Sequence, residues 1–302
     1  MAINPSIASG VEAEATTQLD VVLRSAGFRA NLLELLRKSW LFRIGAVLVL
    51  LSSLLAVIGP YLARHPLETA TSSSNHPPSA TFWFGTDASG LDVFSRVLAA
   101  PRIDVSIALA ATAFSLVLGS LIGLLTSYFR GILGELAMRT TDMIQSFPLF
   151  VLAIIVVVMS GRNLANVILV VALLNTPIYV RLIRTQVLSV RERTFVEAAR
   201  ANGDSELSIA FRHVLPNVMS PSLAQAPITM GFAILVTAGL SFIGAGVQPP
   251  TPEWGEMIAA GANGIVIGQW WTSVFPGLAI SLTVFGFAVI GEGLRAIVLR
   301  KT

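Results

Sequence analysis

Six long, mainly apolar stretches without Asp, Glu, Lys or Arg constrain the fold more than any other feature of this sequence. They span residues 44–63, 105–129, 143–161, 163–180, 213–252 and 257–291. A membrane helix needs roughly 20 such residues to cross a hydrocarbon core about 30 Å thick. Charged residues make up 12% of the chain, against about a quarter in soluble domains. We therefore predict an all-α polytopic membrane protein with six transmembrane helices.

The orientation follows from the basic residues, because positively charged loops tend to stay in the cytoplasm. Sixteen of the 20 Lys and Arg residues fall before the first span, in the second-to-third and fourth-to-fifth connections, or in the tail. The other side carries Arg64, Arg96, Arg102 and Arg162. With six spans, both termini are predicted to be cytoplasmic.

The spans divide the chain into four regions. They are a cytoplasmic N-terminal segment (1–43), a first transmembrane helix (44–63), an external loop (64–104) and a membrane core (105–298) with a cytoplasmic loop at about 185–220. Residues 1–30 are polar with no strong period, which is typical of a flexible segment. Residues 31–43 have leucines near helical spacing, together with Arg37, Lys38 and Arg43, and predict one interfacial helix anchored to anionic lipid.

Two features concern packing. Gly119 and Gly123 form a GxxxG motif in the second span, which either marks close helix contact or arises by chance in an apolar helix. In the external loop, Asp87 and Asp92 lack the alternating oxygen ligands of a calcium loop. We predict instead that Asp87 caps a helix and that Asp92 pairs at the surface with Arg96, four residues on.

The cytoplasmic loop begins with a predicted capping box, in which Thr194 and Glu197 satisfy each other's backbone amides. Small residues follow at Ala198, Ala199 and Ala201, so that another surface could approach this helix closely.

Gly203 is predicted to end this helix in the left-handed conformation. Asp204 or Ser205 then caps a second short helix, which we expect to stop before Pro216. The residues alone leave open whether this elbow is a docking site or an ordinary surface hairpin.

Several kinds of chemistry find no support in the sequence. No GxxxxGK[ST] phosphate loop occurs, because both lysines follow arginine. The chain has no cysteine, its three histidines lack metal-binding spacing, and its basic residues form no dense nucleic-acid patch. The predicted spans contain almost no ionisable group of the kind that proton-driven carriers use as relays. We expect no catalytic, cofactor or metal site, and energy supplied by another subunit.

The stretch from Glu197 through Gly203, EAARANG, followed by Leu215-Pro216, resembles the EAA loop of ABC importer permeases. Further segments agree in order over roughly residues 35–295. They are FGTDASGLDVFSRV at 84–97, FVEAARANG at 195–203, RHVLPN at 212–217, LSFIGAGVQPPTPEWGEM at 240–257 and GEGLR at 291–295. Together they resemble the second permease subunit of the dipeptide, oligopeptide and nickel ABC importers.

The resemblance implies a type I ABC importer permease fold in the bacterial cytoplasmic membrane. It implies a heterodimer with a homologous permease, two cytoplasmic ATPase subunits that bind ATP and Mg, and an external solute-binding protein. The EAA elbow would be the coupling helix seated in an ATPase groove. The residues that carry over to this role are Glu197, Ala198, Ala199, Gly203, Leu215 and Pro216.

Three positions depart from the pattern of this family. Leu91 replaces a usual polar or basic residue, Thr237 stands where relatives often have Glu, and Ala296 replaces the usual Asp. These departures leave the external contacts and the cargo open. A peptide is the leading cargo, with a nickel chelate or a modified peptide as alternatives. An ion-coupled carrier would need ionisable residues at mid-membrane, which the spans almost lack. A structural membrane anchor would leave the elbow unexplained.

Overall fold

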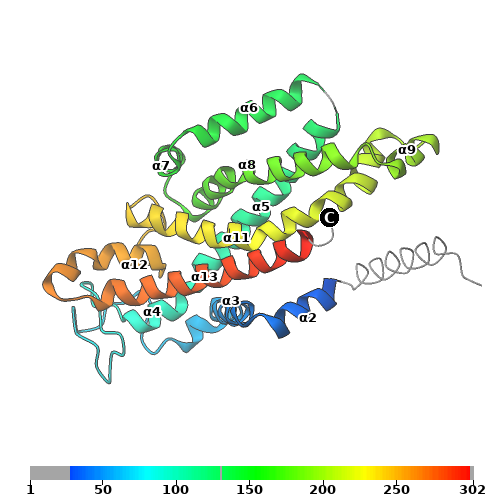
Figure 1. Cartoon of the computed structure of the whole chain (residues 1–302). Helices are drawn as coiled ribbons and strands as arrows, with labels where there is room; N and C mark the ends of the chain where they lie inside the picture. Colours follow the sequence, from blue (N-terminus) through cyan, green and yellow to red (C-terminus); the bar gives the residue numbers. More distant parts are fainter. Residues whose placement is uncertain (1–27, 130, 300–302) are drawn as a thin grey trace, which may run out of the picture.

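The computed structural model describes residues 28–129 and 131–299, which form helices joined by short turns and one long loop (Figure 1). No strand occurs in these two ranges, only an isolated bridge between Thr86 and Asp92. The α-helices are α2 (Phe28–Lys38), α3 (Trp40–Ile58), α4 (Val93–Ala99), α5 (Pro101–Tyr128), α6 (Ile132–Ser146), α7 (Leu149–Ser160), α8 (Leu164–Val190), α9 (Thr194–Ala201), α10 (Glu206–Ser208), α11 (Leu215–Phe242), α12 (Trp254–Gly261) and α13 (Trp271–Leu299). Short 3₁₀ segments, Gly59–Leu62 and Ala262–Ile267, and a π-helical segment, Ile209–Val214, complete the list.

Five helical segments are long and apolar enough to cross a membrane, and they contain α3, α5, α8, α11 and α13. The predicted third span is not one helix. It is replaced by α6 and α7, which are bent by 97° at Phe147 and Pro148. Residues before proline avoid the helical conformation, and Phe147 is accordingly extended. If this bent pair is one crossing, the total is six, as predicted.

The first span begins earlier than predicted. The predicted bounds of the interfacial helix, 31–43, are wrong, because α2 ends at Lys38 and α3 begins at Trp40. The Ser39 hydroxyl accepts a hydrogen bond from the Phe42 amide at 3.2 Å and caps α3. Trp40 and Arg43 therefore belong to the membrane helix. Residues 1–27, where a flexible segment is predicted, lie outside the described residues.

Close packing of α5 on α8 holds the centre of the bundle. A Cβ atom at Gly119 would lie 2.6 Å from the Tyr179 Cβ, and one at Gly123 would lie 2.8 Å from the Val180 carbonyl oxygen. The GxxxG motif is therefore a real contact, at which a larger side chain would push the helices apart. Pro177 lies inside α8, where a kink is expected.

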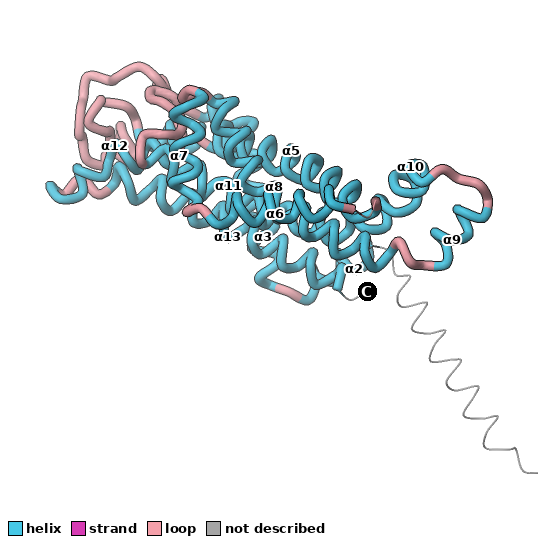
Figure 2. Tube along the Cα trace, turned by 90° about the horizontal axis from the view of Figure 1, so that it is seen from above, coloured by secondary structure: helices cyan, strands magenta, loops and turns pink. Residues whose placement is uncertain are grey.

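Two apolar cores occupy the bundle. The larger core runs along the spans and reaches the buried Trp254 and Trp271. The smaller core joins the ends of α5 and α8 to α9 and the start of α11. Figures 1 and 2 place α9 at one end of the bundle and α12, with the long loop before α4, at the other. We call residues 191–214 the elbow, and residues 64–104 with 244–270 the loop end.

Candidate functional site

The elbow begins where α8 ends at Val190, and α9 projects from the bundle (Figure 2). The predicted capping box does not form. The residue before the helix is Arg193, and no side chain caps α9. The helix begins one residue earlier than predicted, so the Thr194 hydroxyl lies past the position from which it could accept the first free amides. The Glu197 amide instead donates to the Arg193 carbonyl at 3.4 Å.

The end of α9 agrees with the prediction. Gly203 has a φ of +84°, a left-handed conformation that glycine adopts without strain from a side chain. The Gly203 amide donates to the Arg200 carbonyl at 3.0 Å, and the Asp204 amide donates to the Ala199 carbonyl at 3.2 Å. This pair of bonds is a Schellman motif, which fixes the direction of the chain as it leaves the helix.

The second half of the elbow differs from the prediction. Ser205 caps α10 by accepting from the Ser208 amide at 3.3 Å, as expected. The helix does not stop before Pro216, however, but continues through the π-helical segment into α11. In that segment the Leu215 amide donates to the Ala210 carbonyl, five residues back. Pro216 lies just after the π-helical segment, so its missing N–H falls where the hydrogen-bond pattern changes from the π-helical to the α-helical spacing.

The predicted coupling residues divide between two faces. Ala199 is buried, and Leu215 packs against the smaller core. Glu197, Ala198 and Gly203 are exposed on α9 or its terminal turn, as is Pro216 on α11. The inward face joins the elbow to the smaller core, whereas the outward face is exposed.

Hydrogen bonds fasten the elbow to the end of α5. The Arg200 Nε lies 2.8 Å from the Glu206 Oε1, across the Gly203 turn. The Tyr128 hydroxyl donates to Glu206, and Arg191 donates to the Ser127 carbonyl at 2.8 Å. The hydrogen bond to Glu206, followed by that to Tyr128, raises the pKa of Arg200. We call Arg200, Glu206 and Tyr128 the clasp. Sequence reasoning missed it, because nothing in the local pattern marks Tyr128 as a partner of Arg200 and Glu206.

The loop end contains a buried ion pair that sequence reasoning also missed. The Arg96 Nη2 lies 2.9 Å from the Glu256 Oε2, with side-chain exposures of 2% and 11%. The Arg96 Nη1 donates to the Leu67 and Pro250 carbonyls at 2.9 and 2.7 Å. The predicted surface pair of Asp92 with Arg96 is therefore wrong. Asp92 instead caps α4 through the Ser95 amide at 2.9 Å.

The prediction that Asp87 caps a helix is also wrong, because its carboxylate accepts from the Leu91 amide within the loop at 2.8 Å.

Burial raises the pKa of Glu256, although the Arg96 guanidinium opposes that shift. The Glu253 and Asp87 carboxylates also raise the pKa of Glu256. Buried ion pairs such as Arg96 and Glu256 fix geometry more than they add stability.

The start of α12 is held from two directions. The Glu253 carboxylate caps the helix through the Gly255 and Glu256 amides at 2.9 and 2.7 Å. The Trp254 amide donates to Asp104 at 3.3 Å, and its indole N–H donates to the Val97 carbonyl at 3.1 Å. These bonds join α12 to α4 and α5.

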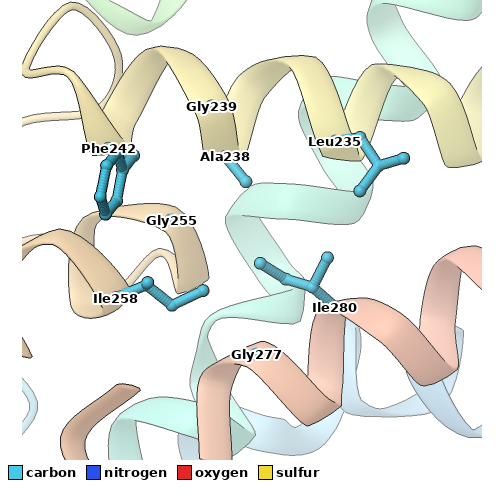
Figure 3. Close-up of a pocket in the computed structure, with 8 residues that line it drawn as sticks. All are labelled: Leu235, Ala238, Gly239, Phe242, Gly255, Ile258, Gly277 and Ile280. Atoms are coloured by element: carbon cyan, nitrogen blue, oxygen red, sulfur yellow. The ribbon is translucent and has the colours of Figure 1, made fainter. Parts of the chain in front are cut away.

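An apolar cavity of about 270 Å³ opens between α11, α12 and α13 (Figure 3). The cavity is lined by Leu235, Ala238, Gly239, Phe242, Gly255, Ile258, Gly277 and Ile280. None of these residues is ionisable, so the cavity contains no proton relay. Within residues 28–129 and 131–299, no cluster of His, Asp or Glu has the arrangement of a metal site.

The three positions that depart from the family pattern differ in environment. Leu91 is only 8% exposed, so its side chain is not available to an outside partner in this conformation. Thr237 is fully buried in α11. Ala296 is exposed near the end of α13.

Residues 115–302 match the protein family described as the inner membrane component of binding-protein-dependent transport systems. The chain belongs to this family. It is 40% identical over 267 residues to the probable D,D-dipeptide transport system permease protein DdpC of Escherichia coli, covering 88% of this chain and 89% of that protein. It is 38% identical over 261 residues to the dipeptide transport system permease protein DppC of Alkalihalophilus pseudofirmus, covering 86% of each chain.

A third relative is the glutathione transport system permease protein GsiD of Escherichia coli, 38% identical over 265 residues and 86% of each chain. The fold resembles a chain of the inward-facing MetNI methionine ABC transporter, with a TM-score of 0.54 and 18% identity. That match covers 67% of this chain and 96% of the solved one. This permease family and the apolar helices place the chain in the cytoplasmic membrane as a multi-pass protein.

Proposed function

We propose that this permease is the membrane-spanning subunit of an ATP-driven importer of di- or oligopeptides. It forms half of the translocation path with a homologous permease, and both of its termini are cytoplasmic. Two ATPase subunits bind ATP and Mg in the cytoplasm, and a solute-binding protein delivers the cargo outside. The names of the relatives, which are dipeptide, D,D-dipeptide and glutathione permeases, support the peptide cargo.

The proposed regions are those that the sequence delimits, except that the first span begins at Trp40. The segment before Trp40 and the loop at about 185–220 are cytoplasmic, and residues 64–104 lie outside. The elbow is the ATPase-coupling site, since one of its faces is exposed and the other packs into the smaller core. Glu197, Ala198 and Gly203 present the docking face, and Pro216 follows on the exposed side of α11. Ala199 and Leu215 act from inside, by attaching that face to the core.

The observation that carries this proposal is that one face of α9 is buried and the opposite face is exposed. Val196 and Ala199 belong to the smaller core, which also contains residues of α5, α8, the π-helical segment and α11, while the opposite face of the helix is exposed. A force applied to the outer face would therefore move three membrane helices together, because packed cores transmit displacement with little compression.

The docking role is tested by Ala198→Trp in the reconstituted importer complex. A large side chain on the outer face would prevent close approach of an ATPase, so uptake of a dipeptide and stimulated ATP turnover should both fall more than tenfold. Ala198→Ser keeps the face slim and should retain both activities. Unchanged uptake in the tryptophan variant would reject the elbow as the coupling site.

A modified peptide is the second candidate cargo, favoured by the glutathione relative, and a nickel chelate is a third. Purifying the complex with its solute-binding protein and identifying the retained ligand by mass spectrometry distinguishes these cargoes. A peptide supports the proposal, whereas a metal chelate would overturn the peptide assignment and leave the coupling test unaffected.

A further inference from the structure

The membrane face of α3 lies at the edge of the bundle and carries a groove that no part of the described chain fills. The groove measures about 420 Å³ and is lined by Trp40, Arg43, Ile44, Val47 and Leu48. Trp40 is 66% exposed and Val47 is 62% exposed. In Figure 1, α3 lies beside α2 and away from α6 and α7.

The groove is apolar along its length and cationic at one end. Trp40, Ile44 and Val47 follow helical spacing and therefore share one face of α3. Farther along this helix, Leu50 and Val57 are 70% and 68% exposed. In a membrane span, such a surface is covered by acyl chains or by another membrane protein.

Arg43 lies at the end of the span and forms no ion pair within residues 28–129 and 131–299. On the preceding α2, Lys38 is neutralised by Glu34 at 2.7 Å, whereas Arg37 has no ion pair in the same ranges. The local charge is therefore positive. Tryptophan beside arginine at a span terminus is typical of the headgroup region of a bilayer.

We propose that this groove binds one anionic phospholipid. The phosphate contacts the Arg43 guanidinium, and an acyl chain lies along Ile44, Val47 and Leu48. Trp40 covers the junction between headgroup and chain, and Arg37 adds attraction from α2. The proposal depends only on the membrane location of α3 and not on the cargo or on the coupling role of the elbow.

The test uses the complete complex reconstituted in phosphatidylcholine vesicles that contain brominated phosphatidylglycerol or brominated phosphatidylcholine. Bromine quenches nearby tryptophan fluorescence, and subtracting the signal of a Trp40→Phe complex isolates Trp40 from the chain's other four tryptophans. We expect brominated phosphatidylglycerol to quench Trp40 at a several-fold lower mole fraction than brominated phosphatidylcholine.

Arg43→Gln should reduce this preference about fivefold, since one basic residue near an anionic surface contributes about that factor in affinity. Arg43→Lys should retain most of it, which also guards against a folding defect. Arg139→Gln, at an exposed arginine of α6 paired with Glu135, should leave the preference unchanged.

Three outcomes would overturn the proposal. Equal quenching by both lipids would show that the groove does not recognise the anion. Absence of quenching by either lipid would show that protein covers it, whether a partner subunit or another part of this chain. A preference that survives Arg43→Gln would show that the anion binds elsewhere.

Discussion

The two ends of the molecule keep their shapes by different means. At the loop end, Arg96 and Glu256 form an ion pair that is almost completely buried. At the elbow, Arg200 and Glu206 form a similar pair at 2.8 Å, with side-chain exposures of 44% and 49%. Removing one partner of a buried ion pair leaves an uncompensated charge and is strongly destabilising, whereas water and salt weaken an exposed pair. The loop end therefore depends on its charges, and the elbow depends on its apolar core.

The largest expected effect is at the loop end. Arg96→Met leaves the Glu256 carboxylate buried without its partner, which should cost about 3–5 kcal/mol of unfolding free energy. Thermal unfolding of the purified complex measures the loss. Combining Arg96→Met with Glu256→Leu removes both charges and should restore most of the stability. If the single variant matched the wild type, the pair would not hold this end together.

The next effect separates the two faces of α9. Ala199→Trp forces an indole into the smaller core and should destabilise the protein by about 1–3 kcal/mol. Ala198→Trp places the same side chain in the open and should leave the unfolding midpoint unchanged, although coupling is lost. Size-exclusion chromatography after stepwise heating compares the two variants. Equal destabilisation by the two variants would contradict the assignment of Ala199 to a buried face and Ala198 to an exposed one, on which the docking face depends.

A smaller effect is shared by both ends. Gly203 and Gly268 have φ values of +84° and +88°, and a Cβ atom at either would meet no other atom within 4 Å. Alanine in this conformation should cost about 1 kcal/mol at each position, from backbone strain alone. Only Gly203→Ala should also lower ATP-coupled uptake, because only that turn adjoins the docking face. A matching uptake defect in Gly268→Ala would indicate a global cause.

The smallest expected effect is at the exposed clasp. Arg200→Gln should leave the unfolding midpoint within the scatter of repeated measurements, because water screens the pair and the core beneath it is intact. Arg139→Gln, which removes another exposed pair at 2.6 Å, is the matched control. A clear loss of stability in Arg200→Gln alone would mean that the clasp, and not the core, holds the elbow.

Much of the architecture could be predicted, because a membrane helix is identified by the composition of about 20 consecutive residues. The five long spans and the left-handed Gly203 needed only runs of apolar residues and one glycine. The ends of helices could not be predicted where two local preferences compete. Pro148 bent the third span, and Ser39 divided the predicted interfacial helix. Pro216 does not stop the helix, because it lies where the π-helical segment passes into α11 and the hydrogen-bond spacing changes.

The candidate site was found by its motif, but the roles of its residues were not. Ala198 and Ala199 are adjacent and chemically identical, yet one is exposed and the other is buried. Their difference depends on the smaller core, to which α5, α8, the π-helical segment and α11 all contribute and which includes Ala199 but not Ala198. The predicted capping box failed for a similar reason, since a shift of one residue at the start of the helix moved Thr194 out of the capping position.

The sequence by itself determined that this chain crosses a membrane, belongs among importer permeases and carries an elbow closed by glycine. These properties depend on hydrophobicity and turn chemistry, which act over a few residues. Only the tertiary structure decided which face of α9 is available and that Arg96 pairs with Glu256, 160 residues away along the chain. Such choices are made by packing between distant segments, where burial makes one partner necessary and another impossible.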